Sequence, residues 1–214
     1  MCDANLEGKF SKMESRSLKN KSLLIIFYRN PELGKVKTRL AAQIGDAKAF
    51  SIYLLLADHT RRITEKLPVH KALFYSDHID KKDNWPNRKY KKHVQSGKDL
   101  GDKMMNSFEA GFTAGYKSIC IIGSDCLELT GKIIEEAFVK LKNHDAVIGP
   151  ARDGGYYLLG MTKLYPHLFQ NKNWSTDTVL SSTLDDFKTL GLDFWELKPL
   201  NDVDEEIDLP AHFR

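Results

Sequence analysis

The feature that most constrains the fold is the unbroken apolar run from Leu23 to Tyr28, which ends at the breaker sequence Asn-Pro-Glu-Leu-Gly over residues 30–34. An apolar run without polar alternation is typical of a strand that is covered on both faces. Behind the breaker, a helix is predicted from about residues 36–38 to 44. Asp46 is expected to cap a longer helix that reaches about residue 66.

Strands and helices continue to alternate along the rest of the chain. Further strands are predicted at 72–75, 90–95, 119–122, 146–148, 156–161 and 194–197, and helices at 100–116, 131–142 and 176–190. This alternation indicates an α/β protein with a mostly parallel sheet and helices on both faces. Ligands of such sheets bind beyond the carboxyl ends of the strands, so polar residues that directly follow a strand are the candidates for a site.

Length and composition indicate one domain in a reducing compartment. Residues 1–21 lack apolar periodicity and are expected to form a disordered polar tail, which leaves 22–214 as a single domain. Three cysteines without a C-x-x-C pair do not make a disulfide framework. No secretory leader and no apolar run of about 20 residues is present, so we expect a cytoplasmic protein with no membrane partner. The net charge of +3 does not favour nucleic acid.

The loop that follows the first strand has the composition of a phosphate site. Its candidate binding residues are Gly34, Lys35, Lys37, Thr38 and Arg39. The glycine permits a close backbone approach, and three positive charges precede a helix whose first N–H groups favour an anion. The spacing is neither that of a P-loop nor that of the dinucleotide fingerprint. The alternative interpretation is a solvated basic loop.

Ser124 and Asp125 directly follow the predicted strand at 119–122. A carboxylate at this place is suited to hold a divalent cation such as Mg²⁺ against the phosphates of a nucleotide, with Ser124 on the nucleotide side. The alternative is that Asp125 is a turn former or an N-cap. Cys126 has no partnered base and is not assigned as a nucleophile.

Two further segments are candidates for contact with a ligand. Arg152, Asp153, Gly154 and Gly155 form a turn, in which Asp153 would bind a sugar hydroxyl, an acceptor group or a metal-bound water. A plain tight turn is the alternative. The second segment, Trp174-Ser175-Thr176, has the pattern of a helix start with an aromatic plug, and its hydroxyls could bind the acceptor.

Asp202 and Asp204 lie in the acidic segment Asn201–Glu206. Two aspartates separated by one residue point the same way from an extended segment and can share a cation. A solvated acidic surface is the alternative interpretation.

Taken in order, these segments resemble a bacterial glycosyltransferase-like family of the GT-A superfamily of nucleotide-diphospho-sugar transferases. The resemblance rests on 28–41, 123–126, 149–160 and 174–176, and more weakly on 202–204. Some members are named arsenosugar-biosynthesis glycosyltransferases. The chain departs from the family in having Leu127 in place of a proline, in lacking Thr-Pro after Asp204, and in lacking an Asp-x-Asp pair at Asp125.

The resemblance implies a three-layer α/β/α GT-A fold and assigns roles to matching residues. Asp125 would hold Mg²⁺ or Mn²⁺, and Asp202 or Asp204 would complete the metal site. Lys37 and Arg39 match the basic loop, and the turn at Asp153 matches the acceptor or sugar side. The expected function is a metal-dependent transferase that uses a nucleotide sugar and a small-molecule acceptor. Asp125 and Asp153 are its candidate catalytic residues.

Three alternatives remain open at this point. Phospholactate guanylyltransferases, and more distantly the molybdenum-cofactor guanylyltransferases, share the fold, so the chain could move a nucleotide from a nucleoside triphosphate onto a phosphorylated acceptor. A non-catalytic nucleotide-binding relative is a second alternative. A nucleic-acid module is the third, and only the basic segment 81–92 with its interleaved aromatics supports it.

Overall fold

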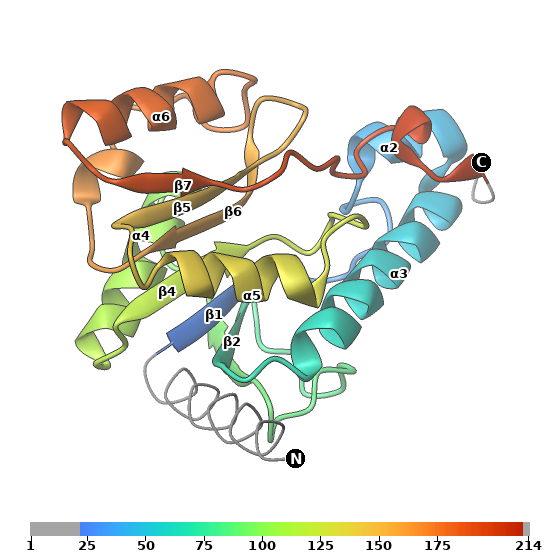
Figure 1. Ribbon diagram of the computed structural model, residues 1–214. Coiled ribbons are helices and arrows are strands. Elements are labelled where there is room, and N and C mark those ends of the chain that lie inside the picture. Colours follow the sequence, from blue (N-terminus) through green and yellow to red (C-terminus); the bar gives the residue numbers. More distant parts are fainter. Residues whose placement is uncertain (1–21, 212–214) are drawn as a thin grey trace, which may run out of the picture.

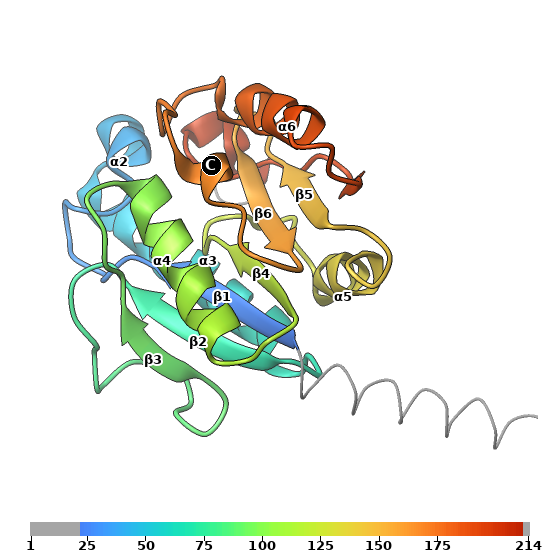
Figure 2. The same ribbon diagram turned by 90° about the vertical axis from the view of Figure 1, so that its left-hand side faces the viewer.

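The computed structural model describes residues 22–211 and contains one seven-stranded sheet in the order β3-β2-β1-β4-β6-β5-β7 (Figure 1, with β3 labelled in Figure 2). The strands are β1 (Ser22–Tyr28), β2 (His70–Tyr75), β3 (Lys91–Val94), β4 (Ser118–Ile122), β5 (Ala146–Pro150), β6 (Tyr156–Met161) and β7 (Phe194–Glu196). The predicted tail, residues 1–21, lies outside the described residues.

The sheet is mostly parallel, as the alternation of strands and helices predicts. β1 pairs in parallel with β2 and β4, β2 with β3, and β5 with β7. β6 is antiparallel to both neighbours, β4 and β5. The chain runs outward from β1 to β3 and then returns to place β4 on the other side of β1. The carboxyl ends of β1 and β4 therefore form a topological switch point, where ligands bind in open α/β sheets.

Helices cover both faces of the sheet, which confirms the predicted three-layer α/β/α arrangement. The helices are α2 (Thr38–Ile44), α3 (Asp46–Glu65), α4 (Leu100–Thr113), α5 (Gly131–Lys140) and α6 (Val179–Thr189), with 3₁₀ turns η1 (Pro166–Phe169) and η2 (Glu206–Asp208). α3 and α5 lie on one face, and the turned view of Figure 2 shows α4 on the other.

Side-chain alternation along β1 explains the two cores. Leu24 and Ile26 pack toward α3 and α5, whereas Leu23 and Ile25 pack toward α4 and α6. Successive side chains of a strand point to opposite faces, so a strand that is apolar at every position must be covered twice.

The starts of two helices differ from the sequence prediction, and α4 and α5 end at Thr113 and Lys140 rather than at residues 116 and 142. Asp46 is the first residue of α3 and not its N-cap, because Gly45 takes that position with a φ of 84°. The last long helix begins at Val179 and not at Thr176, because the preceding residues form a turn in which Ser175 has a φ of 64°. The predicted cap of α5 is confirmed, since the Thr130 side chain accepts a hydrogen bond from Ile133 N.

A third, smaller core fixes the C-terminal segment beside the first loop. Leu40 of α2 and Leu56 of α3 pack with Val203 and Leu209, all of them buried. Val203 N also donates a hydrogen bond of 3.1 Å to Asp125 O. This packing carries the residues around Val203 to the carboxyl end of the sheet. Within 22–211, no helix combines the length and apolarity that crossing a membrane requires.

Candidate functional site

A cavity of about 860 Å³ opens at the switch point between β1 and β4. Its size lies within the usual range of small-molecule and cofactor pockets. Its walls come from the segments after β1, β2, β3 and β4, from the β5–β6 turn, from residues 174–179 and from the C-terminal segment. Loops that are far apart in the sequence therefore meet at the one place where the sheet topology predicts a ligand.

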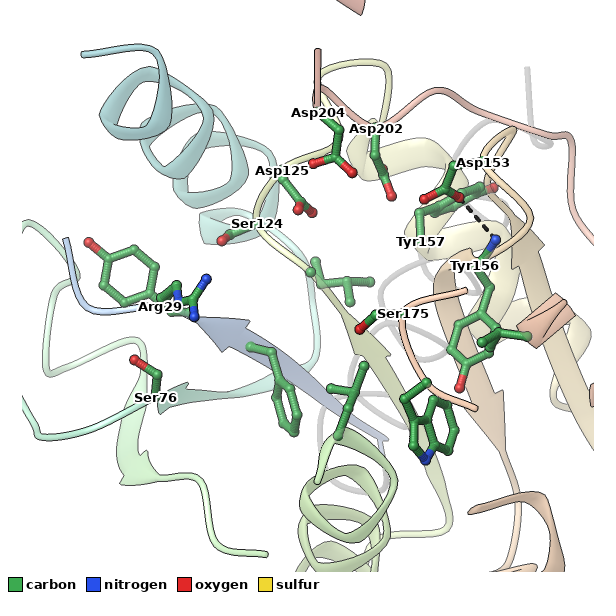
Figure 3. Close-up of a pocket in the computed structure, with 18 of the residues that line it drawn as sticks. Arg29, Ser76, Ser124, Asp125, Asp153, Tyr156, Tyr157, Ser175, Asp202 and Asp204 are labelled. Atoms are coloured by element: carbon green, nitrogen blue, oxygen red, sulfur yellow. Dashed lines mark hydrogen bonds between the residues drawn. The ribbon is translucent and has the colours of Figure 1, made fainter. Parts of the chain in front are cut away.

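Four aspartates gather along one side of this cavity (Figure 3). Asp125 follows β4 directly, Asp153 lies in the β5–β6 turn, and Asp202 and Asp204 come from the C-terminal segment. Val203 is the buried residue between the last two, so Asp202 and Asp204 both line the cavity while Val203 packs inward. The structure thus brings together the carboxylates that the sequence proposes for a metal.

Lys37 lies between two of these carboxylates. Its Nζ atom donates hydrogen bonds to Asp125 Oδ2 at 3.0 Å and to Asp204 Oδ1 at 2.9 Å. Only 7% of the Lys37 side chain is exposed. Burial lowers the pKa of this ammonium, but the charges of Asp125 and Asp204 outweigh burial and raise the pKa above its ordinary value. Lys37 therefore carries its charge inside the acidic cluster.

The other residues of the predicted phosphate loop separate into two groups. Thr38 and Arg39 line the cavity, and Arg39 also forms an ion pair with Asp204. Lys35 does not line it: the Lys35 side chain is 74% exposed and pairs with Glu32 at 2.6 Å. Gly34 is also outside, in a turn with a φ of 77°. The structure therefore does not bring Lys35 and Gly34 to the cavity wall, because the turn directs Lys37 inward and Lys35 outward.

Helix α2, whose first N–H groups the sequence proposed for an anion, begins in the wall of the cavity at Thr38 and Arg39. It has only seven residues, and its N-cap, Lys37, has a φ of 48° and makes no side-chain cap hydrogen bond. The side chains of Lys37 and Arg39 supply positive charge at this end of the cavity.

Asp202 is the most perturbed carboxylate of the site. Its Oδ1 atom is buried and has no hydrogen-bond partner among residues 22–211. Burial, followed by the charge of Asp125, raises the pKa of Asp202 to about 7. An unpaired buried carboxylate oxygen is costly unless a cation or a proton satisfies it.

The acidic residues fit a divalent cation chemically. Carboxylate oxygens are the donors that Mg²⁺ prefers, together with phosphate oxygens of a bound nucleotide. The buried and unpartnered Oδ1 of Asp202 beside Asp125 is an observation that favours this fit. In the described part of the chain, however, no three His, Cys, Asp or Glu residues already surround a metal position. Two of the carboxylates concerned are held by Lys37 instead.

Within the predicted acceptor loop, residues 152–155, two residues line the cavity and two do not. Asp153 and Gly155 line the cavity, and Asp153 Oδ1 accepts a hydrogen bond of 2.9 Å from Gly155 N. Gly154 packs against the backbone of Asp177 and does not line the cavity. Arg152 is exposed and also lies outside, with its N–H bonded to Leu200 O. The structure therefore does not bring Arg152 and Gly154, two of the predicted acceptor-side residues, to the cavity wall.

Trp174, Ser175 and Thr176 line the cavity as the sequence proposed. They belong to a turn rather than to a helix. The indole of Trp174 packs against Gly101, where a Cβ atom would lie 2.4 Å from Trp174 Nε1. Because Gly101, in the first turn of α4, has no side chain, the indole fits into the wall of the cavity.

Several lining residues were not proposed from the sequence. Arg29, Ser76 and Gln95 each come directly after a parallel strand, namely β1, β2 and β3. The rule that polar residues at strand ends mark a site could have found all three. Lys103 lines the cavity from the first turn of α4, and no local sequence signal distinguishes it from other lysines.

Asn30 joins the segments that follow β1 and β2. It is 4% exposed, and its Oδ1 accepts hydrogen bonds from Ser76 Oγ at 3.2 Å and from Asp77 N at 3.0 Å. Its Nδ2 donates to His78 O at 2.9 Å, and its N–H donates to Ser76 Oγ at 3.0 Å. One buried amide therefore holds Ser76 beside Arg29 in the wall of the cavity.

Residues 59–176 match the family described as "Uncharacterized protein conserved in bacteria" (DUF2064). The chain belongs to this family. The matched segment contains Asp125, the Asp153 turn and Trp174, but it excludes the Lys37 loop and the C-terminal aspartates.

Solved structures place this DUF2064 member in the nucleotide-diphospho-sugar transferase fold. A Desulfovibrio desulfuricans G20 protein, named provisionally as a nucleotide-diphospho-sugar transferase, is 30% identical, with 86% of this chain and 82% of that chain covered and a TM-score of 0.80. The GT-A-type fold expected from the motifs is thereby confirmed.

More distant structures share the fold alone. An inositol-1-phosphate CTP transferase from T. maritima is 12% identical, with 90% and 93% coverage and a TM-score of 0.53. A 4-diphosphocytidyl-2C-methyl-D-erythritol synthase from Anaerococcus prevotii DSM 20548 is 11% identical, with 91% and 95% coverage and a TM-score of 0.53. Among curated proteins, no significant sequence match was found.

Proposed function

We propose that this DUF2064 member is a metal-dependent transferase whose donor is a nucleotide sugar. The observation that carries the proposal is the meeting of Asp125, Asp202 and Asp204 at the switch point, with one Asp202 oxygen buried and unpartnered. The 30% identical relative, named provisionally as a nucleotide-diphospho-sugar transferase, supports the same class of donor. Fold alone does not define an activity, so the proposal rests on this site.

The acidic residues and the basic residues of the cavity would each bind the donor in a different way. The three aspartates would hold Mg²⁺ or Mn²⁺, which when bound neutralises charge that develops on the leaving diphosphate. Arg29 and Lys103 line the same cavity and form no ion pair within residues 22–211. Their uncompensated positive charges are available to phosphate oxygens, and a preorganised charge of this kind stabilises a transition state without reorganisation.

Asp153 would act on the acceptor. One of its oxygens is held by Gly155 N, which fixes the carboxylate in the wall of the cavity. Ser175, Thr176 and Trp174 line the same cavity from a different segment. We assign Asp153 the role of orienting, or removing a proton from, the acceptor hydroxyl. A well-placed general base typically contributes roughly 10²–10⁴-fold to the rate.

Nucleotidyl transfer from a nucleoside triphosphate is the second candidate function. Arg29 and Lys103 favour it, because a third phosphate group would need more positive charge than a metal ion on the aspartates supplies. The products distinguish the two reactions. Glycosyl transfer releases a nucleoside diphosphate, whereas nucleotidyl transfer releases pyrophosphate.

The test is a thermal-shift screen of nucleotide sugars, nucleoside diphosphates and nucleoside triphosphates, each with and without Mn²⁺. A ligand that binds only the folded state stabilises it by about 2.7 kcal/mol at a hundredfold excess over Kd. A metal-dependent shift with a nucleotide sugar, lost in Asp125→Asn, is the expected result. A shift confined to a triphosphate would favour nucleotidyl transfer. No shift with any nucleotide would contradict both, and binding without turnover would favour a non-catalytic relative.

A further inference from the structure

Lys37 forms ion pairs with two of the candidate metal ligands. Its Nζ atom lies 3.0 Å from Asp125 Oδ2 and 2.9 Å from Asp204 Oδ1. Asp125 follows β4, whereas Asp204 belongs to the C-terminal segment, so one buried ammonium joins two walls of the cavity. If a divalent cation bound these two carboxylates, the cation and the Lys37 ammonium would both lie against the same carboxylate oxygens.

The backbone of Lys37 indicates that these contacts determine its position. Its φ of 48° and ψ of 47° lie in the left-handed region, which costs a residue other than glycine of order 1–3 kcal/mol. Lys37 also makes no cap hydrogen bond at the start of α2. Such strain persists only where surrounding contacts over-determine it, and the contacts here include the two ion pairs, the hydrogen bond from Ala41 N to Lys37 O and the burial of the neighbouring Val36.

Lys35 shows that the inward placement is specific to Lys37. It carries the same charge on the same loop, but its side chain is 74% exposed and pairs with Glu32. An exposed ion pair of this kind contributes little, whereas a buried ammonium must be compensated by its partners. The two lysines are therefore a matched pair for experiment.

We propose that Lys37 is a built-in counter-ion of the acidic cluster and competes with a divalent cation for the carboxylates of Asp125 and Asp204. This inference rests on the proposed metal dependence. In the metal-free protein, the ammonium offsets the repulsion between the two carboxylates. When a cation takes their charge, Lys37 leaves them, and its own positive charge becomes available to a substrate phosphate.

The test measures Mn²⁺ binding to the full chain without nucleotide, by electron paramagnetic resonance of free Mn²⁺. Lys37→Met removes the charge and keeps an unbranched side chain of similar length. We expect its Kd for Mn²⁺ to fall at least tenfold below that of the wild type. Lys35→Met is the matched control and should change the Kd by less than twofold.

An unchanged or weaker Mn²⁺ affinity in Lys37→Met would overturn the competition while leaving the metal-dependent function standing. Absence of Mn²⁺ binding in both proteins would also overturn it. The proposed function is judged separately, by the thermal shift that nucleotide and Mn²⁺ produce together.

A second measurement uses the wild-type chain and so does not depend on a folded variant. Lysine acetylation by a water-soluble reagent is followed by mass spectrometry with and without Mn²⁺. The buried and paired Lys37 should react slowly in the metal-free protein and several-fold faster with Mn²⁺, while Lys35 stays constant. Equal labelling of Lys37 in both conditions would contradict its displacement.

Discussion

The backbone carbonyl of Asp177 packs directly against Gly154, where a Cβ atom would lie only 2.1 Å from the carbonyl oxygen. Leu180 N also donates a hydrogen bond of 2.8 Å to Gly154 O. Gly154 follows Asp153, and Asp177 follows Thr176, so this contact joins the two segments of the proposed acceptor side.

Gly154→Ala should destabilise the protein and displace the acceptor side. Gly154 has a φ of 89°, which already disfavours alanine, and the clash is with a backbone atom that cannot rotate away. We expect a loss of about 2–4 kcal/mol in the free energy of unfolding, since overpacking typically adds 1–3 kcal/mol to the backbone strain. Urea denaturation measures it.

Gly115→Ala is the matched control for this clash. Gly115 has almost the same φ, 90°, but no atom lies within 4 Å of a Cβ placed there. Its substitution should cost only the backbone strain of about 1 kcal/mol. Equal losses in the two variants would show that the close contact between Gly154 and Asp177 contributes nothing.

Asn30→Ala should weaken nucleotide binding. It removes the buried amide that holds Ser76, Asp77 and His78, and it leaves their polar groups without partners. A buried polar group without a partner costs about 1–3 kcal/mol. We expect a lower melting temperature and a smaller thermal shift with nucleotide, whereas Asn87→Ala, at an exposed position, should change neither. A full nucleotide shift in Asn30→Ala would refute its positioning role.

Asp125→Asn should abolish turnover and leave the fold intact. Asparagine keeps an oxygen for Lys37 but removes the negative charge from the proposed metal site. The loss in kcat/KM should be roughly 10²–10³-fold or greater, as for other single preorganised electrostatic groups. Asp185→Asn, an exposed aspartate of α6, is the control. Retained activity with unchanged Mn²⁺ dependence would remove Asp125 from the site.

Tyr90 should make the protein less stable at alkaline pH. Burial raises the pKa of its phenol to about 12, against an ordinary value of 10.0. The folded state therefore keeps a proton that the unfolded state loses, so stability is complete below pH 10 and falls as the pH rises toward 12. Comparing Tyr90→Phe with the wild type by urea denaturation isolates this proton. The free energy of unfolding of the wild type, minus that of Tyr90→Phe, should fall by up to about 1.4 kcal/mol per pH unit above pH 10. A constant difference from pH 9 to 11 would refute it.

Local pattern was sufficient for most of the elements. The apolar run that became β1 is buried on both faces, and Thr130 caps α5, because these features depend on residues only a few positions apart. The placement of Asp125 directly after a buried strand also followed from local pattern. Its position at the carboxyl end of the sheet is what made it a candidate.

Tertiary structure alone decided which charged groups enter the site. Lys35 and Lys37 look alike in the sequence, but the turn and the left-handed backbone of Lys37 direct one side chain outward and the other into the cavity. Sequence pattern carries no signal for this choice, because it depends on contacts with the far end of the chain. The Lys37–Asp204 pair spans 167 positions.

The sequence by itself determined the strands, the helices and the polar residues that could meet at the sheet edge. Only folding determined that they do meet, since Asp202 and Asp204 reach the cavity through the burial of Val203 and Leu209 against Leu40. Side-chain periodicity follows from backbone geometry within one element, whereas this docking depends on apolar surfaces that exist only after α2 and α3 have packed together.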